Sequence, residues 1–297
     1  MDRLLAYEMF VATARVHSFS GAARQLGLSP QAMTRGIAAL EARLGLTLFH
    51  RTTRAVSLTA EGAQLLPHAE RLLRDLADAE REASGGLAEP RGELHVTAPV
   101  AFGRIHIMPV VCDLLARHER LDLRLLLIDR NVRMAEEGID VAVRIGALPD
   151  MALSAVRVGS VREVIVASAA YLARRGVPST PADLAGHDLI ASTGPRGAGE
   201  WRFGDRRKAV PAARRRLKVN TVDAALAAAD AGLGLGNFLS YQVADAVASG
   251  RLVEVLRPEA PAEIPVNLLF EAARGSAPAT RAFIEAMRQR AREQGWG

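Results

Sequence analysis

Residues 18–36 read SFSGAARQLGLSPQAMTRG, and this stretch decides the fold of the first part of the chain. Ser20 is a good N-cap for a short helix that ends before Gly27, and glycine tolerates the positive φ of a tight turn. Ser29 is the N-cap of the next helix, and Pro30 fits that helix's first position. A short helix, a glycine turn and a Ser-Pro-capped helix predict a helix-turn-helix.

The helix that begins at Pro30 has two different faces. At about 100° per residue, one face carries Met33, Ile37, Leu40 and Leu44. The opposite face carries Gln31, Thr34, Arg35 and Ala38. An amide, a hydroxyl and a guanidinium near a helix N-terminus can bind base edges and phosphates in a major groove. The alternative is a three-helix bundle whose outer face is polar and has no nucleic-acid partner.

A hairpin with a basic tip favours the DNA-binding alternative. Residues 48–50 and 55–58 are apolar enough for two short strands. The residues between these strands are Arg51, Thr52, Thr53 and Arg54. Two cations and two hydroxyls on a turn beside a helix-turn-helix form a wing suited to phosphates or to a minor groove.

These segments together resemble the DNA-binding domain of LysR-type transcriptional regulators. The resemblance is carried by Phe19-Ser20-Gly21-Ala22-Ala23, Ser29-Pro30-Gln31-Ala32-Met33-Thr34-Arg35, Leu40-Glu41, Leu48-Phe49, Arg51-Thr52-Thr53-Arg54 and Leu58-Thr59-Ala60-Glu61-Gly62. It runs from residue 4 to about 66 without a gap. The only departure noted here is Thr34, where the family more often has Ser. The resemblance implies DNA contacts by Ser20, Ser29, Pro30, Gln31, Thr34, Arg35, Arg51, Thr52 and Arg54.

A long helix follows the wing. Thr59 is a suitable N-cap, and Glu61 in the first turn complements the helix dipole. Pro67 bends the helix or lies near its start. An apolar stripe consists of Leu65, Leu66, Ala69, Leu72, Leu73 and Leu76. The stripe pairs with a second copy or packs on its own domain. In the resembled family this helix forms the dimer, which implies a two-fold symmetric DNA site.

Composition and charge agree with a folded, multi-domain protein. Of the 297 residues, 49% are hydrophobic and 24% are charged, which excludes a disordered chain. The net charge of +5 permits a nucleic-acid partner without requiring one. The single cysteine, Cys112, excludes an intrachain disulfide, and we expect it to be a small buried hydrophobe on a helix. The longest uncharged run, Ala231–Ala244, is too short to span a bilayer, so we expect a cytoplasmic protein.

The chain divides near residue 90. We expect a DNA-binding domain over 1–59, a linker helix over 60–82, a hinge over 83–91 and an effector-binding domain over 92–297. The last of these alternates strands and helices, which is typical of α/β domains. Its first βαβαβ run, which includes a predicted helix over 132–137, should form a parallel sheet. Lobe I comprises about 92–160 and 266–297, and lobe II about 161–265.

The fold class is therefore α/β overall, with a helix-rich winged helix-turn-helix, a long linker helix and a two-lobed α/β domain. By resemblance, the two-lobed part is an effector domain similar to periplasmic solute-binding proteins. Such sheets bind ligands at the carboxyl ends of strands. The candidate effector residues are Pro99, Val100, Ala101, Phe102, Ser192, Thr193, Thr221 and Asn237. The family often has Ser or Thr at Val100 and Ala101, and their absence weakens the expectation of an anionic effector.

Three other functions compete with regulation. An enzyme lacks support, because Leu239 stands where a dinucleotide fingerprint needs its third glycine and the histidines show no zinc spacing. A free solute-binding protein leaves the first 60 residues unexplained. A structural nucleoid binder would use the winged domain alone, and the ratio of specific to random DNA affinity separates it from a regulator. The basic runs 206–208 and 214–216 are usually solvated edges, and direct DNA contact is the less common alternative.

We therefore predict a LysR-type transcriptional regulator without catalytic residues, metal or cofactor. Its predicted partners are a dyad operator in double-stranded DNA, further copies of itself as a dimer or tetramer, a small effector and the transcription machinery. The effector, the regulated genes and the sign of regulation are not encoded in any pattern found.

Overall fold

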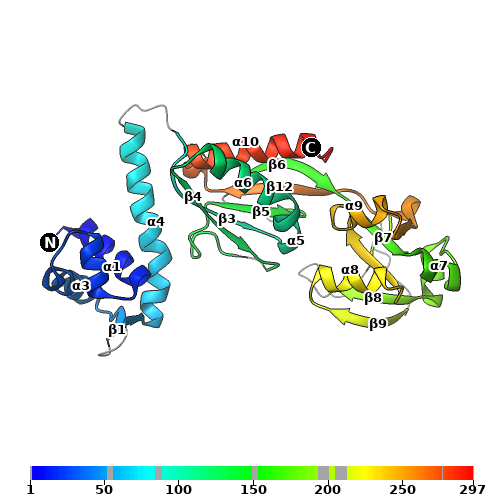
Figure 1. Cartoon of the computed structure of the whole chain (residues 1–297), viewed down its shortest axis with the longest axis horizontal. Helices are drawn as coiled ribbons and strands as arrows, with labels where there is room; N and C mark the ends of the chain where they lie inside the picture. The colour runs from blue at the N-terminus through cyan, green and yellow to red at the C-terminus, as the bar shows by residue number, and fades with distance from the viewer. Residues whose placement is uncertain are drawn as a thin grey trace. The chain divides into compact units, whose positions relative to one another are not determined.

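The computed structural model describes residues 2–51, 56–83, 89–130, 132–148, 153–192, 201–204, 213–275 and 277–296. The chain forms two compact units (Figure 1). The first comprises Met1–Gly92 with Val132–Asp140, and the second comprises Glu93–Asn131 with Val141–Gly297. Among the described residues, no helix combines the length and apolar character needed to cross a membrane.

The first unit is a helical bundle with a small hairpin. Its elements are α1 (Arg3–Val16), α2 (Phe19–Gln25), α3 (Pro30–Leu44), β1 (Phe49–Arg51), β2 (Val56–Leu58) and α4 (Ala60–Ala83). The strands are antiparallel, with Phe49 opposite Leu58. Phe10, Met33, Ile37 and Leu40 are fully buried, so the predicted apolar face of α3 forms the core. The predicted helix-turn-helix and wing strands are confirmed.

The start of α2 differs from the prediction. The helix begins at Phe19, and its N-cap is Ser18, whose Oγ accepts the Gly21 N–H at 3.2 Å. Ser20 lies in the first turn instead, with its Oγ 3.2 Å from the Ser18 Oγ. Starting earlier lets Phe19 pack edge-on against Phe49 of the hairpin.

The first lobe of the second unit is built on a five-stranded sheet. Its elements are β3 (Gly92–Ala98), α5 (Val100–Phe102), a π-helical turn (Gly103–Ile107), α6 (Met108–Arg117), β4 (Leu121–Leu127), β5 (Val141–Ile145), β6 (Ser154–Val161), β12 (Ile264–Phe270) and α10 (Pro278–Glu293). The strand order is β4-β3-β5-β12-β6. β3 and β5 are parallel, but β12 is antiparallel to β5 and β6, so the sheet is mixed. The chain returns to this lobe at β12, which lies between β5 and β6 in the sheet.

The second lobe has its own five-stranded sheet, of order β11-β7-β10-β8-β9. The strands are β7 (Glu163–Ser168), β8 (Asp188–Ser192), β9 (Arg214–Val219), β10 (Leu235–Leu239) and β11 (Leu252–Val255). β8 is parallel to both β9 and β10. The helices are α7 (Ala169–Arg175), α8 (Val222–Asp230) and α9 (Ser240–Ala248). One apolar cluster covers each face of the sheet.

Two predictions about the second part of the chain are wrong. Residues 132–137 do not form a helix, because residues 134–138 form a turn that ends at Gly138 with φ +64°. Cys112 is exposed, because α6 directs its neighbours Val111 and Leu114 into the core.

Candidate DNA interface and effector site

The outward face of α3 carries the predicted reading residues. Gln31, Thr34, Arg35 and Ala38 are all exposed, and they lie opposite the buried Met33, Ile37 and Leu40. The Thr34 hydroxyl donates to the Pro30 carbonyl at 3.0 Å and keeps its lone pairs for an incoming donor. Among the described residues, the Arg35 guanidinium has no acidic partner, so its donors are available to a base edge or a phosphate.

Short polar contacts fix α3 at both ends. Ser29 is its N-cap and accepts the Ala32 N–H at 3.2 Å, with Pro30 in the first turn. The Glu41 carboxylate accepts the backbone N–H groups of Leu48 and Phe49 at 2.8 and 3.4 Å. The Glu41 contacts tie the helix to the start of the hairpin. In the structure Ser29 and Pro30 form the start of α3, and their contact with DNA stays a prediction.

The tip of the wing lies outside the described residues. Thr52 and Arg54 are not described, and Arg51 is described only in its backbone, as the last residue of β1. The hairpin joins α4 through Thr59, whose hydroxyl donates to the Thr47 carbonyl at 2.7 Å and accepts the Gly62 N–H at 3.0 Å. Thr59 thus caps the N-terminus of α4, as predicted.

The apolar stripe of α4 is divided between two environments. Ala69 is buried in the core of its own domain, and Leu65, Leu66 and Leu73 pack against the same core. Leu72 lies outside this cluster with 44% of its surface exposed. The stripe therefore packs in part on its own domain, which is one of the two predicted alternatives. Leu72 remains exposed and could contact a second copy of the chain.

The segment after β3 does not present the predicted set of free groups. Pro99 is the N-cap of α5, and Ala101 and Phe102 are buried. Phe102 packs against Tyr241, with ring centroids 5.2 Å apart, and so belongs to the core. Val100 is exposed, and its N–H donates to the Asp129 carboxylate at 3.1 Å. The amide of Val100, one of the candidate effector residues, is therefore already bound by an acidic side chain of the protein.

The start of α8 in the second lobe approaches this segment. Arg104, just beyond α5, forms an ion pair with Asp223 in the first turn of α8 at 3.0 Å. Thr221 is the N-cap of α8 and accepts the Ala224 N–H at 3.3 Å. Ser192 ends β8, half-buried, whereas Thr193 lies outside the described residues. The Arg104–Asp223 contact thus joins the segment after β3 to the start of α8. The sequence reasoning did not include Arg104, Asp129 or Asp223.

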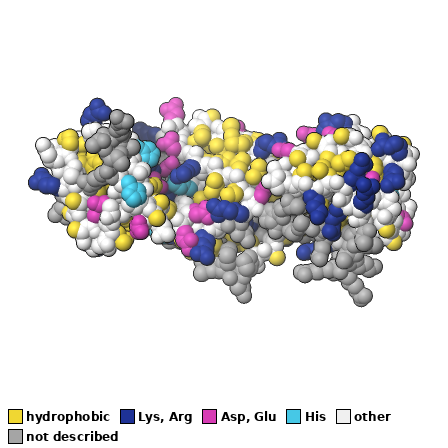
Figure 2. Space-filling view, turned by 90° about the horizontal axis from the view of Figure 1, so that it is seen from below, with side chains coloured by type: hydrophobic (Ala, Val, Ile, Leu, Met, Phe, Trp, Pro, Cys, Tyr) yellow, Lys and Arg dark blue, Asp and Glu magenta, His cyan; other side chains and the backbone are white. Residues whose placement is uncertain are grey.

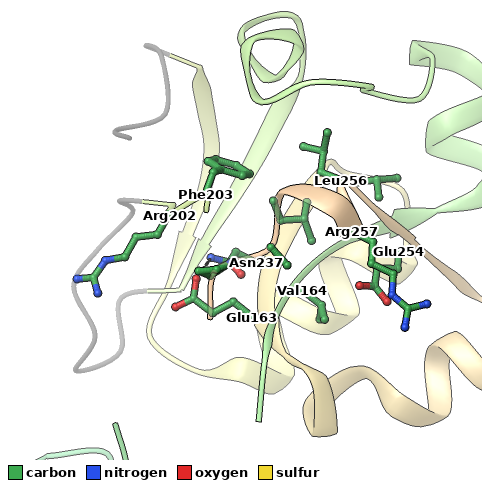
Figure 3. Close-up of a pocket in the computed structure, with 12 residues that line it drawn as sticks. Glu163, Val164, Arg202, Phe203, Asn237, Glu254, Leu256 and Arg257 are labelled. Carbon is green, nitrogen blue, oxygen red and sulfur yellow. Dashed lines mark hydrogen bonds between the residues drawn. The ribbon is translucent and has the colours of Figure 1, made fainter. Parts of the chain in front are cut away.

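Asn237 lies elsewhere, in a hollow on the second lobe (Figure 3). Its amide donates to Glu163 at 3.4 Å, and its Oδ1 is buried without a hydrogen-bond partner among the described residues. The apolar lining of this hollow includes Val164, Phe203 and Leu256. An unsatisfied buried acceptor costs about 1–3 kcal/mol, which a single water or a donor group of a ligand would relieve.

The chain passes from the first lobe to the second between β6 and β7, beside this hollow. Arg162, between β6 and β7, accepts the Ser240 N–H at its carbonyl at 2.9 Å. The Arg162 guanidinium forms a bidentate pair with Glu254, and this pairing raises the pKa of the arginine. These contacts fix the point at which the chain passes from one lobe to the other.

Known protein families match both parts of the chain. The family described as "Bacterial regulatory helix-turn-helix protein, lysR family" matches residues 4–63. The family described as "LysR substrate binding domain" matches residues 87–292. The chain therefore belongs to the LysR family of transcriptional regulators, with a helix-turn-helix DNA-binding domain and a substrate-binding domain.

Individual relatives agree over nearly the whole length. The HTH-type transcriptional regulator PtxR of Pseudomonas aeruginosa is 34% identical over 283 residues, which cover 94% of this chain and 90% of PtxR. The structure of CrgA, a LysR-type transcriptional regulator from Neisseria meningitidis, is similar with a TM-score of 0.62 and 27% identity, over 97% of this chain and 99% of CrgA. ArgP from Mycobacterium tuberculosis shares the fold, with a TM-score of 0.65 over 96% of each chain and 21% identity.

Proposed function

We propose that this regulator binds a two-fold symmetric operator as a dimer or tetramer and responds to a small molecule bound between the lobes of its C-terminal domain. The observation that supports specific DNA reading is the exposed Gln31, Thr34 and Arg35 on a helix whose opposite face is buried. The wing supplies phosphate contacts beside it, through Arg51, Thr52 and Arg54. The N-caps of the helix-turn-helix orient the reading residues and bring backbone amides to the phosphates.

Replacing Arg35 tests the reading helix. A bidentate arginine contact to a base is worth about 1–3 kcal/mol, so Arg35→Ala should weaken binding about 5- to 150-fold. The target is DNA selected from a random library by the wild-type protein, and fluorescence anisotropy gives the affinity. Because Arg35 has no acidic partner among the described residues, the melting temperature should not change.

Arg43→Ala is the matched control, because Arg43 lies in the last turn of the same helix and stacks over the Tyr7 ring, 5.4 Å from its centroid. This change removes the same charge from the same helix and should spare sequence preference. Equal loss on selected and random DNA for Arg35→Ala would argue for a nucleoid binder, and unchanged binding would refute the reading-helix assignment.

The effector site that we propose lies where Val100, Arg104, Thr221 and Asp223 meet. Asp129 already occupies the Val100 amide, and its charge opposes a second carboxylate at that position. We infer that the effector presents an uncharged or cationic group to this end of the site. A ligand held by both lobes changes their relative populations, and that shift is the physical basis of the proposed response.

A further inference from the structure

Three arginines of the second lobe surround one aspartate. Asp188, the first residue of β8, has a side chain only 10% exposed. Arg175 and Arg216 approach its Oδ2 at 3.7 Å, and Arg214 approaches its Oδ1 at 4.0 Å. We name Arg175, Arg214 and Arg216 the β9 arginine cluster. One carboxylate for three guanidiniums leaves a charge of +2 at this place.

The arginines of the cluster remain available to another partner. Their side chains are 48%, 77% and 50% exposed for Arg175, Arg214 and Arg216. All three contacts to Asp188 are longer than a hydrogen bond, so within the described part of the chain Asp188 holds the guanidiniums through charge alone. Each guanidinium therefore retains donors for a second acceptor.

The aspartate itself is held rigidly. Its backbone N–H donates to the hydroxyl of the buried Tyr171 at 2.9 Å, and this hydroxyl lies 3.2 Å from Nδ1 of His187. Burial lowers the pKa of His187, with a smaller contribution from Arg175, and this favours the neutral ring. The cluster is therefore assembled on a fixed anchor, and binding a partner need not order the backbone beneath it.

The surroundings of the cluster are basic and open. β9 is an edge strand of its sheet, and Arg214–Arg216 are exposed in succession. Residues 161–265 contain 14 Lys and Arg against 11 Asp and Glu, so this lobe carries +3 of the net +5 of the chain. Figure 2 shows several Lys and Arg side chains over the second lobe. An exposed cationic edge suits an extended polyanion better than a small enclosed ligand.

We propose that the β9 arginine cluster is a second DNA-binding surface, which contacts the phosphate backbone independently of sequence. Arginine matches phosphate oxygens with paired N–H groups, which favours phosphate over the scattered carboxylates of an acidic protein. The chain already binds DNA through its winged domain, so the local DNA concentration around a tethered lobe is high. The cluster would add phosphate contacts on the same duplex beyond those of the reading helix and the wing.

The salt dependence of DNA binding by the full chain tests this proposal. Each phosphate contact contributes about 0.9 to the slope of log affinity against log salt. Arg214→Ala/Arg216→Ala should lower that slope by about 2 per protomer on a 60-base-pair random duplex. Arg214→Lys/Arg216→Lys keeps both charges and should keep most of the slope. Melting curves of both double variants, together with the slope of Arg214→Lys/Arg216→Lys, distinguish the loss of a phosphate contact from unfolding of the lobe.

Arg117→Ala/Arg251→Ala is the matched control. Arg117 hydrogen-bonds a carbonyl of its own helix, and Arg251, 57% exposed, pairs with Asp230 beside the other edge strand of the second lobe. The control pair loses the same charge and should keep the wild-type slope. An equal slope change in both double variants would show a general charge effect and overturn the proposal.

Two further measurements distinguish the alternatives. In an Arg35→Ala background, the cluster variant should still lower the slope, because the proposal rests on the DNA binding of the family and not on the assigned reading residues. A labelled oligoglutamate serves as the probe for an acidic protein partner. If the cluster variant weakens only oligoglutamate binding and leaves the DNA slope unchanged, the surface serves a protein and the DNA proposal is wrong.

Discussion

His106 is a buried histidine without a hydrogen-bond partner among the described residues. It lies in the π-helical turn, 5% exposed, with ring centroids 4.8 Å from Phe102, 5.1 Å from Trp296 and 5.4 Å from Tyr241. Burial, with a smaller contribution from Arg290, lowers its pKa from 6.5 to about 4. The folded domain therefore requires the neutral imidazole as part of an aromatic cluster.

This environment predicts a loss of stability in mild acid. In the unfolded chain His106 binds a proton below pH 6.5, whereas in the folded chain it does so only below about 4. The free energy of unfolding thus falls as the pH decreases through 6.5, and the loss is complete below 4. At 1.36 kcal/mol per pKa unit, the loss between pH 7.5 and 5 is about 2 kcal/mol. Urea unfolding at both values should show this loss in the wild type.

His106→Phe is the control for the acid effect, because it keeps an aromatic ring and removes the titration. Its unfolding free energy should change with pH by about 2 kcal/mol less than that of the wild type. The same pH dependence in both proteins would show that other groups cause the effect.

At the scale of elements, periodic patterns predicted the buried and exposed faces of helices correctly. Contacts between residues far apart in the sequence could not be predicted from such patterns. The angle between Met33 and Arg35 on a helix is a local property, and the structure places the two residues on opposite faces as expected. Ser18 and Ser20 both flank Phe19, and the choice of cap depends on the packing of that ring against Phe49. Sequence spacing alone cannot make this choice.

The proposed effector site shows the same limit. Val100 and Asp129 are 29 residues apart, and Arg104 and Asp223 are 119 apart. No periodicity connects such residues, because their proximity depends on the strand order of two sheets. Among the candidates predicted at strand ends, Thr221 is the N-cap of α8, whereas Phe102 is buried and Asn237 lies in a separate hollow.

The partly covered face of α4 leads to a prediction about assembly. Its own domain covers Leu65, Leu66 and Leu73, while Leu72 is exposed. A leucine buried in an interface contributes about 1.5–3 kcal/mol, so Leu72→Glu should weaken dimerisation at least tenfold. The dissociation constant follows from size-exclusion chromatography with light scattering over a range of concentrations.

Val177→Glu introduces the same charge at another exposed apolar residue, outside the linker helix. Val177→Glu should leave the oligomeric state unchanged, because an added surface charge alone does not break the dimer. An unchanged dimer in Leu72→Glu would move the dimer interface away from this face of α4.

At the scale of the whole molecule, the two lobes of the second unit meet through contacts of two kinds. Arg104 and Asp223 form an exposed ion pair across them, and such pairs contribute at most about 1 kcal/mol. Phe102 and His106 of the first lobe also pack against Tyr241 of the second lobe, so a ligand that repositions the lobes must displace aromatic packing as well as an ion pair. The larger constraint on its chemistry is Asp129, which is exposed and holds the Val100 amide.

The charge of Asp129 predicts which ligands stabilise the protein. A ligand that binds only the folded state raises the melting temperature. In a thermal-shift panel of matched carboxylates, primary amides and amines, the wild type should be stabilised by amides or amines and not by their carboxylates. Asp129→Asn keeps an acceptor for the Val100 amide and removes the charge, so carboxylates should gain affinity in this variant by comparison with amines. Glu136→Gln, at a carboxylate paired with Arg133 on the surface, is the control for charge alone. If a carboxylate stabilises the wild type and Asp129→Asn equally, Asp129 does not face the ligand, and the effector binds elsewhere in the domain.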